Sequence, residues 1–230
     1  MKVQDNNTNL SKCLEKVEIF KSCLPNRVDP ASISHKAKIP FNVMTYRESL
    51  LHRMTELSES ATELYSTPNR AVSAIVLSRA AQETFALLYV LHLNVTNVVK
   101  TNRLDGFHDY LMTNTFGYRT KADDDLPTMP NILGAIDKVD KELGGHFRWS
   151  YEILSEYCHP NCAGVHSSYV KIDRENIWAD IGSTHTIESI EPIIGMLLAS
   201  LELFEHYYNE ISSIMKVFIE ICENDIKQKT

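Results

Sequence analysis

The residues best suited to chemistry lie in the stretch 151–161, which reads YEILSEYCHPN. If the chain is helical here, at 100° per residue, one stripe of the helix carries Arg148, Glu152, Ser155 and His159. His159 is a candidate general acid or base, because imidazole changes its charge near neutral pH and a carboxylate can hold its tautomer. The alternative is an ordinary solvated face, on which His159 only caps the last turn.

A second candidate is the ion pair Arg79 and Glu83, one helical turn apart in residues 67–93, a segment with no polar face. A helix that is apolar all round lies either in the centre of a bundle or in a membrane. An ion pair within such a helix is either a buried structural bridge or part of a functional site.

Packing of this apolar helix against residues 146–159 would join the two candidates in one cleft. The expected catalytic side chains are then those of His159, Arg79, Glu83 and Glu156. In such a cleft arginine stabilises a pentavalent phosphate, histidine moves the 2′-hydroxyl proton during RNA cleavage, and the glutamates orient them. Asn161 and Arg148 are the expected substrate contacts.

Four potential metal ligands lie within nine residues: Cys158, His159, Cys162 and His166. Zinc favours such side chains, but their spacing lacks the paired CxxC arrangement, and Pro160 constrains it. The three aspartates 123–125 can hold a hard cation, although such a run is more often a solvated loop. No Walker A, GxSxG or GxGxxG motif is present. We therefore expect no metal and no cofactor, with zinc as the alternative.

The composition is typical of a soluble helical protein of the cytoplasm. Gly and Pro are scarce, and the net charge of −7 argues against general DNA binding, although a local site for RNA is compatible with it. The five cysteines are odd in number and irregularly spaced, as free thiols in a reducing compartment are. The start of the chain lacks the apolar core of a signal peptide, and charged residues interrupt the longest apolar segment, so we expect no membrane contact.

The periodicity of apolar residues predicts a single, mostly α-helical domain, a helical bundle with one small β-hairpin. The predicted helices cover residues 9–24, 42–65, 67–93, 102–114, 130–143, 146–158 and 187–222. Residues 168–181 form the predicted hairpin, which we expect to lie on the helical body. The domain spans residues 1–230, of which 1–40 form an N-terminal helix and loop and 41–224 form the bundle core.

The stretch 151–161 resembles a motif of the HEPN-type helical bundles of prokaryotes, in an uncharacterised branch with the pattern Y-x-x-L-S-E-x-x-H-P-N and a later glycine. The residues that carry it are Tyr151, Leu154, Ser155, Glu156, His159, Pro160, Asn161 and Gly164. The apolar helix with Arg79 and Glu83 fits the same pattern, so the resemblance covers the architecture of residues 42–222. It implies a metal-independent ribonuclease of a defence, toxin–antitoxin or stress system, often a homodimer, although other members are non-catalytic.

The nuclease signature of that family is an Arg followed by a His after four to six residues, and no Arg lies at that distance before His159. Two other pairs match by spacing, Arg47 with His52 and Arg103 with His108.

The first functional hypothesis is therefore a bacterial or phage-related HEPN-like protein that acts on RNA. The second is a non-catalytic scaffold that forms a homo-oligomer or binds a protein partner through the regular apolar seam of residues 187–222.

Overall fold

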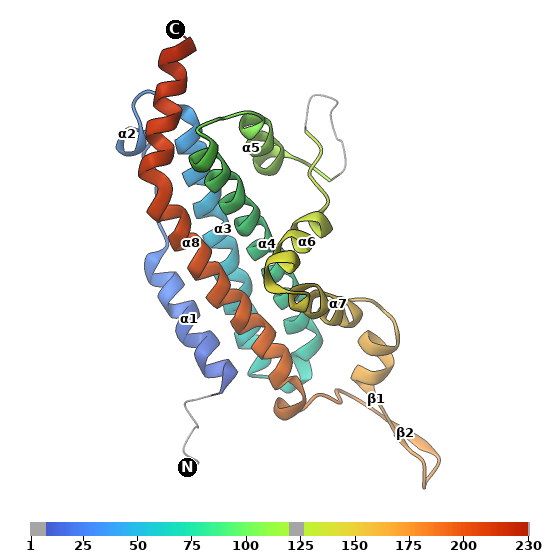
Figure 1. Ribbon diagram of the computed structural model, residues 1–230. Helices are drawn as coiled ribbons and strands as arrows, with labels where there is room; N and C mark the ends of the chain where they lie inside the picture. The colour runs from blue at the N-terminus through green and yellow to red at the C-terminus, as the bar shows by residue number, and fades with distance from the viewer. Residues whose placement is uncertain (1–7, 120–126, 230) are drawn as a thin grey trace.

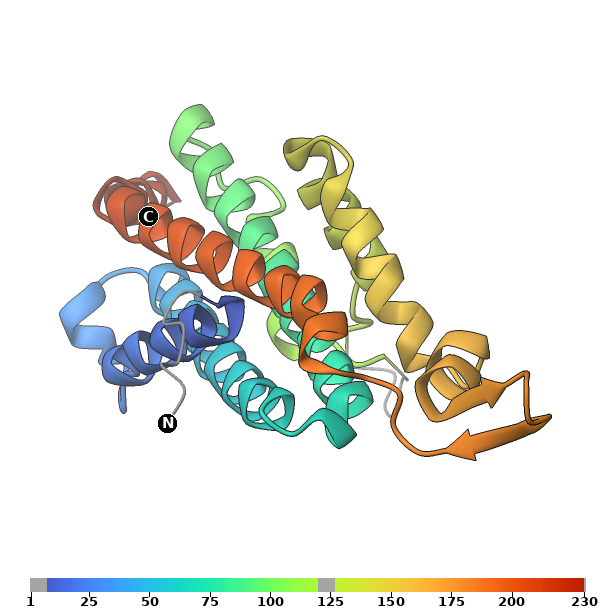
Figure 2. The same ribbon diagram turned by 90° about the horizontal axis from the view of Figure 1, so that it is seen from below.

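The structure is a computed structural model that describes residues 8–119 and 127–229, and it is mostly helical with one two-stranded hairpin, as predicted (Figure 1). The elements are α1 (Asn9–Cys23), α2 (Pro30–Ile33), α3 (Lys38–Tyr65), η1 (Pro68–Arg70), α4 (Ala71–Thr101), α5 (Phe107–Phe116), α6 (Ile132–Leu143), α7 (His146–Cys158), η2 (Cys162–Ser167), β1 (Val170–Asp173), β2 (Trp178–Ile181) and α8 (Ile187–Lys229). Helices α3, α4 and α8 run side by side, and α1 covers α3 and α8. Helices α6 and α7 pack on the far side of α4 (Figure 2).

Helix α4 is the centre of the bundle, because it packs against α3, α6, α7 and α8. The predicted helix ends at Leu93, but α4 continues to Thr101, because Val95 and Val98 are buried in the same core. Asn102, in the left-handed conformation with φ 55°, ends the helix. Among the described residues, α4 alone is long and apolar enough to cross a bilayer, and 67% of its most apolar window is buried inside the bundle.

Two boundaries in the first half of the chain differ from the prediction. Residues 25–40, predicted as a loop, contain the short helix α2 and the first turn of α3. Pro40 lies in that first turn, where its missing N–H has no intrahelical partner and proline is tolerated. Instead of starting the central helix directly, Pro68 begins the 3₁₀ turn η1, which leads into α4 at Ala71.

The apolar seam of helix α8 packs against other helices of the same chain. Side chains along the seam, such as Ile194, Leu201 and Phe218, are fully buried, and α8 packs against α1, α3 and α4. Pro192 lies inside the helix without ending it. The seam is therefore covered by the protein's own core and does not offer a free surface for a partner helix.

The hairpin forms as predicted, but it projects from the bundle (Figures 1 and 2). The antiparallel register pairs Val170 with Ile181, Lys171 with Asp180, Ile172 with Ala179 and Asp173 with Trp178. At its base Gly182 N donates to Tyr169 O at 2.9 Å. Ile172, Ile177 and Trp178 are 57%, 91% and 57% exposed. The prediction that the hairpin lies on the helical body is wrong, because the strands leave η2 in a direction that points away from the helices.

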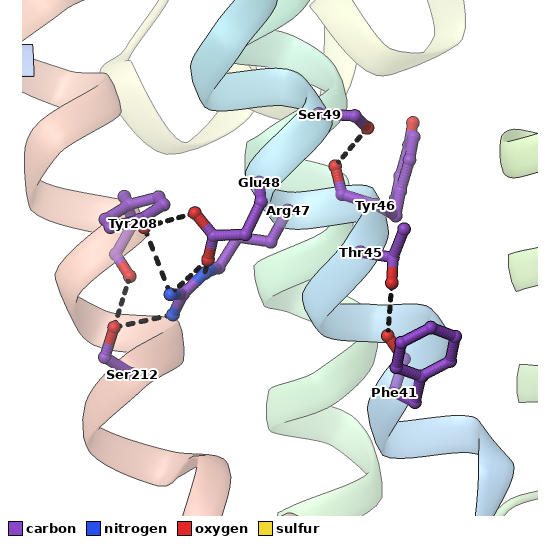
Figure 3. A network of polar contacts seen from close by, with 8 residues as sticks. All are labelled: Phe41, Thr45, Tyr46, Arg47, Glu48, Ser49, Tyr208 and Ser212. Carbon is purple, nitrogen blue, oxygen red and sulfur yellow. Dashed lines mark hydrogen bonds and ion pairs between the residues drawn. The ribbon is translucent and has the colours of Figure 1, made fainter. Parts of the chain in front are cut away.

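A buried network of polar side chains joins α3 to α8 (Figure 3). Arg47 and Glu48 are each 6% exposed, and Nε of Arg47 donates to Glu48 Oε1 at 2.9 Å. Across the interface, Nη1 of Arg47 donates to Ser212 Oγ at 2.6 Å. The Tyr208 hydroxyl donates to Glu48 Oε2 at 2.7 Å, and its ring centroid lies 4.1 Å from the Arg47 guanidinium carbon. Both charges are therefore paired and hydrogen-bonded, as buried charges require.

The stability of the bundle is expected to fall below neutral pH, because the fold keeps His92 neutral. Burial lowers the pKa of His92 below its ordinary value of 6.5, although the carboxylates of Glu210 and Glu142 oppose this shift. The unfolded chain binds a proton near pH 6.5 and the folded chain does not. The free energy of unfolding therefore decreases as the pH falls through 6.5 and levels off below the folded-state pKa.

Urea unfolding at about pH 7.5 and about pH 5.5 measures this effect, and His92→Phe should reduce the difference in the free energy of unfolding between the two. The exposed His108 provides the control, and His108→Asn should leave the difference unchanged. An equal pH response of His92→Phe and the unaltered protein would assign the effect to other groups.

Candidate functional site

The predicted contact between the central helix and residues 146–159 is present, because α7 packs against α4 and completes a polar cluster. Arg79 Nε donates to Ser155 Oγ at 2.8 Å, and Arg79 Nη2 donates to the Tyr151 hydroxyl at 2.5 Å. The Tyr151 hydroxyl donates to Glu83 Oε1 at 2.9 Å, and this oxygen lies 3.2 Å from Arg79 Nη2. Two side chains from each helix thus hold one another in place.

The ion pair of Arg79 and Glu83 lines a cavity of about 890 Å³ between α3, α4, α6 and α7. The side chains of Arg79 and Glu83 are 31% and 24% exposed, so the pair is neither sealed in the core nor fully solvated. The rest of the lining consists of Arg53, Thr84, Leu87, Arg119, Met129, Pro130, Asn131, Ile132, Leu133 and Tyr151. Among the described residues, three arginines and one glutamate line this cavity, a formal charge of +2, and we call it the arginine cavity.

Arg53 and Arg119 present guanidinium groups that the described residues leave largely unpaired, so both can bind a ligand. Arg53 Nε donates to Thr84 Oγ1 at 3.2 Å, and the part of the chain that the structure describes offers no hydrogen-bond partner to Arg119. The N-terminus of α6 lies at the same cavity, where Asn131 Oδ1 accepts from Leu133 N at 3.0 Å. Guanidinium groups and a helix N-terminus both favour anions, so the cavity is suited to a phosphate group.

Glu83 is the group in this cavity that can accept a proton. Burial raises the pKa of Tyr151, and its hydrogen bond to Glu83 raises it further, so the phenol stays protonated at neutral pH. Tyr151 and Arg79 both engage Oε1 of Glu83. Its other oxygen, Oε2, has no hydrogen-bond partner in residues 8–119 and 127–229 and can receive a hydrogen bond or a proton from a ligand.

The other predicted site residues lie outside the arginine cavity. His159 is exposed at the C-cap of α7, and no described residue hydrogen-bonds to its imidazole. Glu156 is also exposed. Arg148 is engaged at the surface by Asp137 at 2.6 Å and Glu152 at 2.8 Å. The structure therefore brings the ion pair of α4 together with Tyr151 and Ser155 of α7, and leaves the side chains of His159, Glu156 and Arg148 apart from it.

The end of the motif stretch builds the turn that follows α7. Glu156 Oε2 accepts from Asn161 Nδ2 at 2.6 Å, and Asn161 Oδ1 accepts from Gly164 N at 3.0 Å. A Cβ at Gly164 would overlap the carbonyl oxygen of His159, so this close approach requires glycine. Asn161, predicted as a substrate contact, thus holds the π-helical turn η2 against the end of α7.

The two Arg–His pairs that match the HEPN spacing do not converge on a site. Arg47 belongs to the buried network, whereas His52 Nε2 lies 2.9 Å from the carbonyl oxygen of Pro25 at the surface. Arg103 and His108 are both exposed, and each is paired with its own aspartate. Neither pair lines the arginine cavity.

The alternative of a zinc site finds no support in the structure. Within the described residues, no three His, Cys, Asp or Glu side chains lie close enough together to hold a metal ion. Burial raises the pKa of the Cys158 thiol, which disfavours the thiolate that zinc binds. The aspartates 123–125 lie outside the described residues.

Sequence reasoning missed Arg53 and Arg119 as site residues. Arg53 lies on the polar face of an amphipathic helix and Arg119 in a connecting segment, and neither position has a local signal that separates it from any other surface arginine. Tyr151 was visible only as a motif residue.

A comparison of the chain with protein-family models, with curated proteins and with solved structures finds no match.

Proposed function

We propose that the protein is a HEPN-like RNA-binding protein of the defence or stress type, which seats a phosphodiester group of RNA in the arginine cavity. The observation that carries the proposal is the convergence of Arg53, Arg79 and Arg119 on one cavity of a chain whose net charge is −7. The overall charge repels RNA from most of the surface, so binding is confined to the place where the guanidinium groups meet.

The size and the mixed lining of the cavity support a nucleotide rather than a free anion. Its volume of about 890 Å³ exceeds what a phosphate group needs. Leu87, Met129 and Leu133 supply apolar surface next to the arginines, against which a ribose or a base can pack. Guanidinium groups bind phosphate oxygens through paired hydrogen bonds, which fixes the phosphodiester relative to Glu83.

The cavity also has the groups for a metal-independent cleavage step. In the proposed reaction Glu83 Oε2 takes the proton of the ribose 2′-hydroxyl, and the 2′-oxygen forms a bond to phosphorus. The bond between phosphorus and the 5′-oxygen breaks, and the 5′-oxygen takes a proton from water, because His159, the proton donor expected from the sequence, lies outside this cavity. The products are a 2′,3′-cyclic phosphate and a 5′-hydroxyl, while Arg79 stabilises the charge on the pentavalent phosphate.

Fluorescence anisotropy with a labelled single-stranded RNA, measured over a range of salt concentrations, tests the binding. Arg119→Gln should weaken binding about tenfold and lower the slope of log K against log salt by about 0.7, because one phosphate contact is lost. Arg119 suits this test because it is exposed and forms no hydrogen bond or ion pair with a described residue. The exposed Arg103 lies outside the cavity, and Arg103→Gln is the matched control. Equal effects of the two variants would contradict the proposal.

Product analysis of the same RNA separates cleavage from binding. The unaltered protein should release fragments ending in a cyclic phosphate, and Glu83→Gln should stop their formation while RNA is still bound. His159→Ala should cleave at the unaltered rate, because His159 does not line the cavity, and a large loss of rate would assign the leaving-group proton to this imidazole instead. Intact RNA after incubation with the unaltered protein would reject the cleavage step and leave the binding proposal to the anisotropy result.

A further inference from the structure

The β-hairpin has an apolar face that the bundle does not cover. Directly paired residues of an antiparallel ladder point to the same face, and successive residues of a strand point to opposite faces. The apolar face therefore consists of Val170, Ile172, Ala179 and Ile181. Of these, Ile172 and Ile181 are among the most exposed large apolar side chains of the described chain. A two-stranded hairpin alone in water is marginally stable, whereas a sheet of more strands with an apolar face is stable.

The outer edge of β1 offers backbone groups to a further strand. The two strands form a sheet by themselves, so each has one edge without a neighbouring strand in the described chain. Along an antiparallel ladder, hydrogen-bonded pairs alternate with pairs whose N–H and C=O groups point outward. Because Gly182 N donates to Tyr169 O, Ile172 belongs to an outward-pointing pair. Its N–H and C=O thus lie on the open edge, where no described residue is hydrogen-bonded to them.

The charges of β1 are complementary to a second copy of the same strand. When two β1 strands pair antiparallel about a twofold axis through Ile172, Lys171 of each copy lies opposite Asp173 of the other copy. The two Ile172 side chains then meet on the apolar face, and their outward backbone groups pair with each other. An axis through Lys171 or through Asp173 would place like charges opposite each other, which is unfavourable. Strand β2 carries a single charge, Asp180, and has no self-complementary register.

We propose that the protein forms a homodimer through the outer edge of β1, in which the two hairpins join into one four-stranded antiparallel sheet. The apolar faces of the two hairpins become continuous in this sheet. The antiparallel strand directions place the two bundles at opposite ends of the sheet, and the hairpin projects far enough to leave room for both (Figures 1 and 2). The inference does not depend on RNA binding, because no residue of the hairpin lines the arginine cavity.

Sedimentation equilibrium of the full chain tests the charge pairing. The double variant Lys171→Glu with Asp180→Lys keeps opposite charges facing each other within the hairpin, but it puts a glutamate opposite Asp173 of the other copy. Two attractive pairs become repulsive, so the dimer should dissociate at least about tenfold more readily. The control exchanges an exposed ion pair of α7, Arg148→Glu with Glu152→Arg, and should leave the dimer unchanged. A monomer at every concentration tested, or an unchanged dimer in the Lys171 double variant, would overturn the proposal.

Disulfide cross-linking locates the twofold axis. Paired Cα atoms across the axis are about 5.5 Å apart, within reach of a disulfide, so Ile172→Cys should give a linked dimer under mild oxidation. Ala179→Cys lies on the same face one strand farther out, where its two copies are about 14 Å apart and should not link. Both variants also carry Cys23→Ser and Cys162→Ser, which remove the exposed thiols, and mass spectrometry of the peptides identifies the bond. Absence of the link at position 172, or an equal link at 179 as face-to-face stacking would give, contradicts this dimer.

Discussion

Replacing Glu48 by alanine is expected to lower the free energy of unfolding by about 3–5 kcal/mol. The substitution leaves the guanidinium of Arg47, only 6% exposed, without its counter-charge between α3 and α8. It also removes the acceptor of the Tyr208 hydroxyl. Ser212 remains as a neutral acceptor and cannot replace a carboxylate. Urea unfolding followed by circular dichroism measures the loss.

The loss of stability in Glu48→Ala should come mainly from the unpaired charge of Arg47, and not only from the lost hydrogen bonds. The double variant Arg47→Met with Glu48→Leu removes both charges and should recover most of the stability, because an apolar pair of similar volume can replace a buried ion pair. The exposed pair of Arg148 and Glu152 is the control, and Glu152→Ala should cost less than about 1 kcal/mol. A cost for Glu48→Ala as small as this control would show that the network is not important for stability.

Replacing Gly164 by alanine is expected to destabilise the protein by about 1–3 kcal/mol, because the added methyl group has no space. Its Cβ would overlap the carbonyl oxygen of His159 and lie 2.7 Å from that of Tyr157. Both oxygens belong to the backbone at the end of α7, so relief requires movement of the helix end or of η2. The hydrogen bond from Gly164 N to Asn161 would then be strained or lost.

Gly134 is the matched control for this substitution. It lies in α6, and a Cβ built on it meets no atom within 4 Å. Gly134→Ala should therefore stabilise the protein by about 0.5–1 kcal/mol, because alanine restricts the unfolded chain and favours the helix. Thermal unfolding of the two variants should thus shift in opposite directions, and a stabilising Gly164→Ala would contradict the role assigned to this turn.

The fold was largely predictable from the sequence, because helix formation depends on local periodicity. The apolar residues of α4, the stop at Gly144 and the seam of α8 all identify helices without knowledge of their neighbours. The hairpin strands were also local, since Val170 and Ile172 alternate with polar residues. The direction in which the hairpin points was not, because it depends on the turn η2, whose π-helical backbone has no periodic signal.

The ion pair of Arg79 and Glu83 was the part of the candidate site that the sequence by itself determined, whereas its contact with α7 was a hypothesis that the sequence does not show. An i,i+4 pair of opposite charges in an otherwise apolar helix can be read from the sequence alone, whereas its polar partners Tyr151 and Ser155 lie on another helix and are seen only in the structure. Only the tertiary structure decided that Arg53 and Arg119 face the same cavity and that His159 does not. Convergence of side chains from separate elements depends on how helices cross and where loops return, and both are set by packing between residues far apart in the chain.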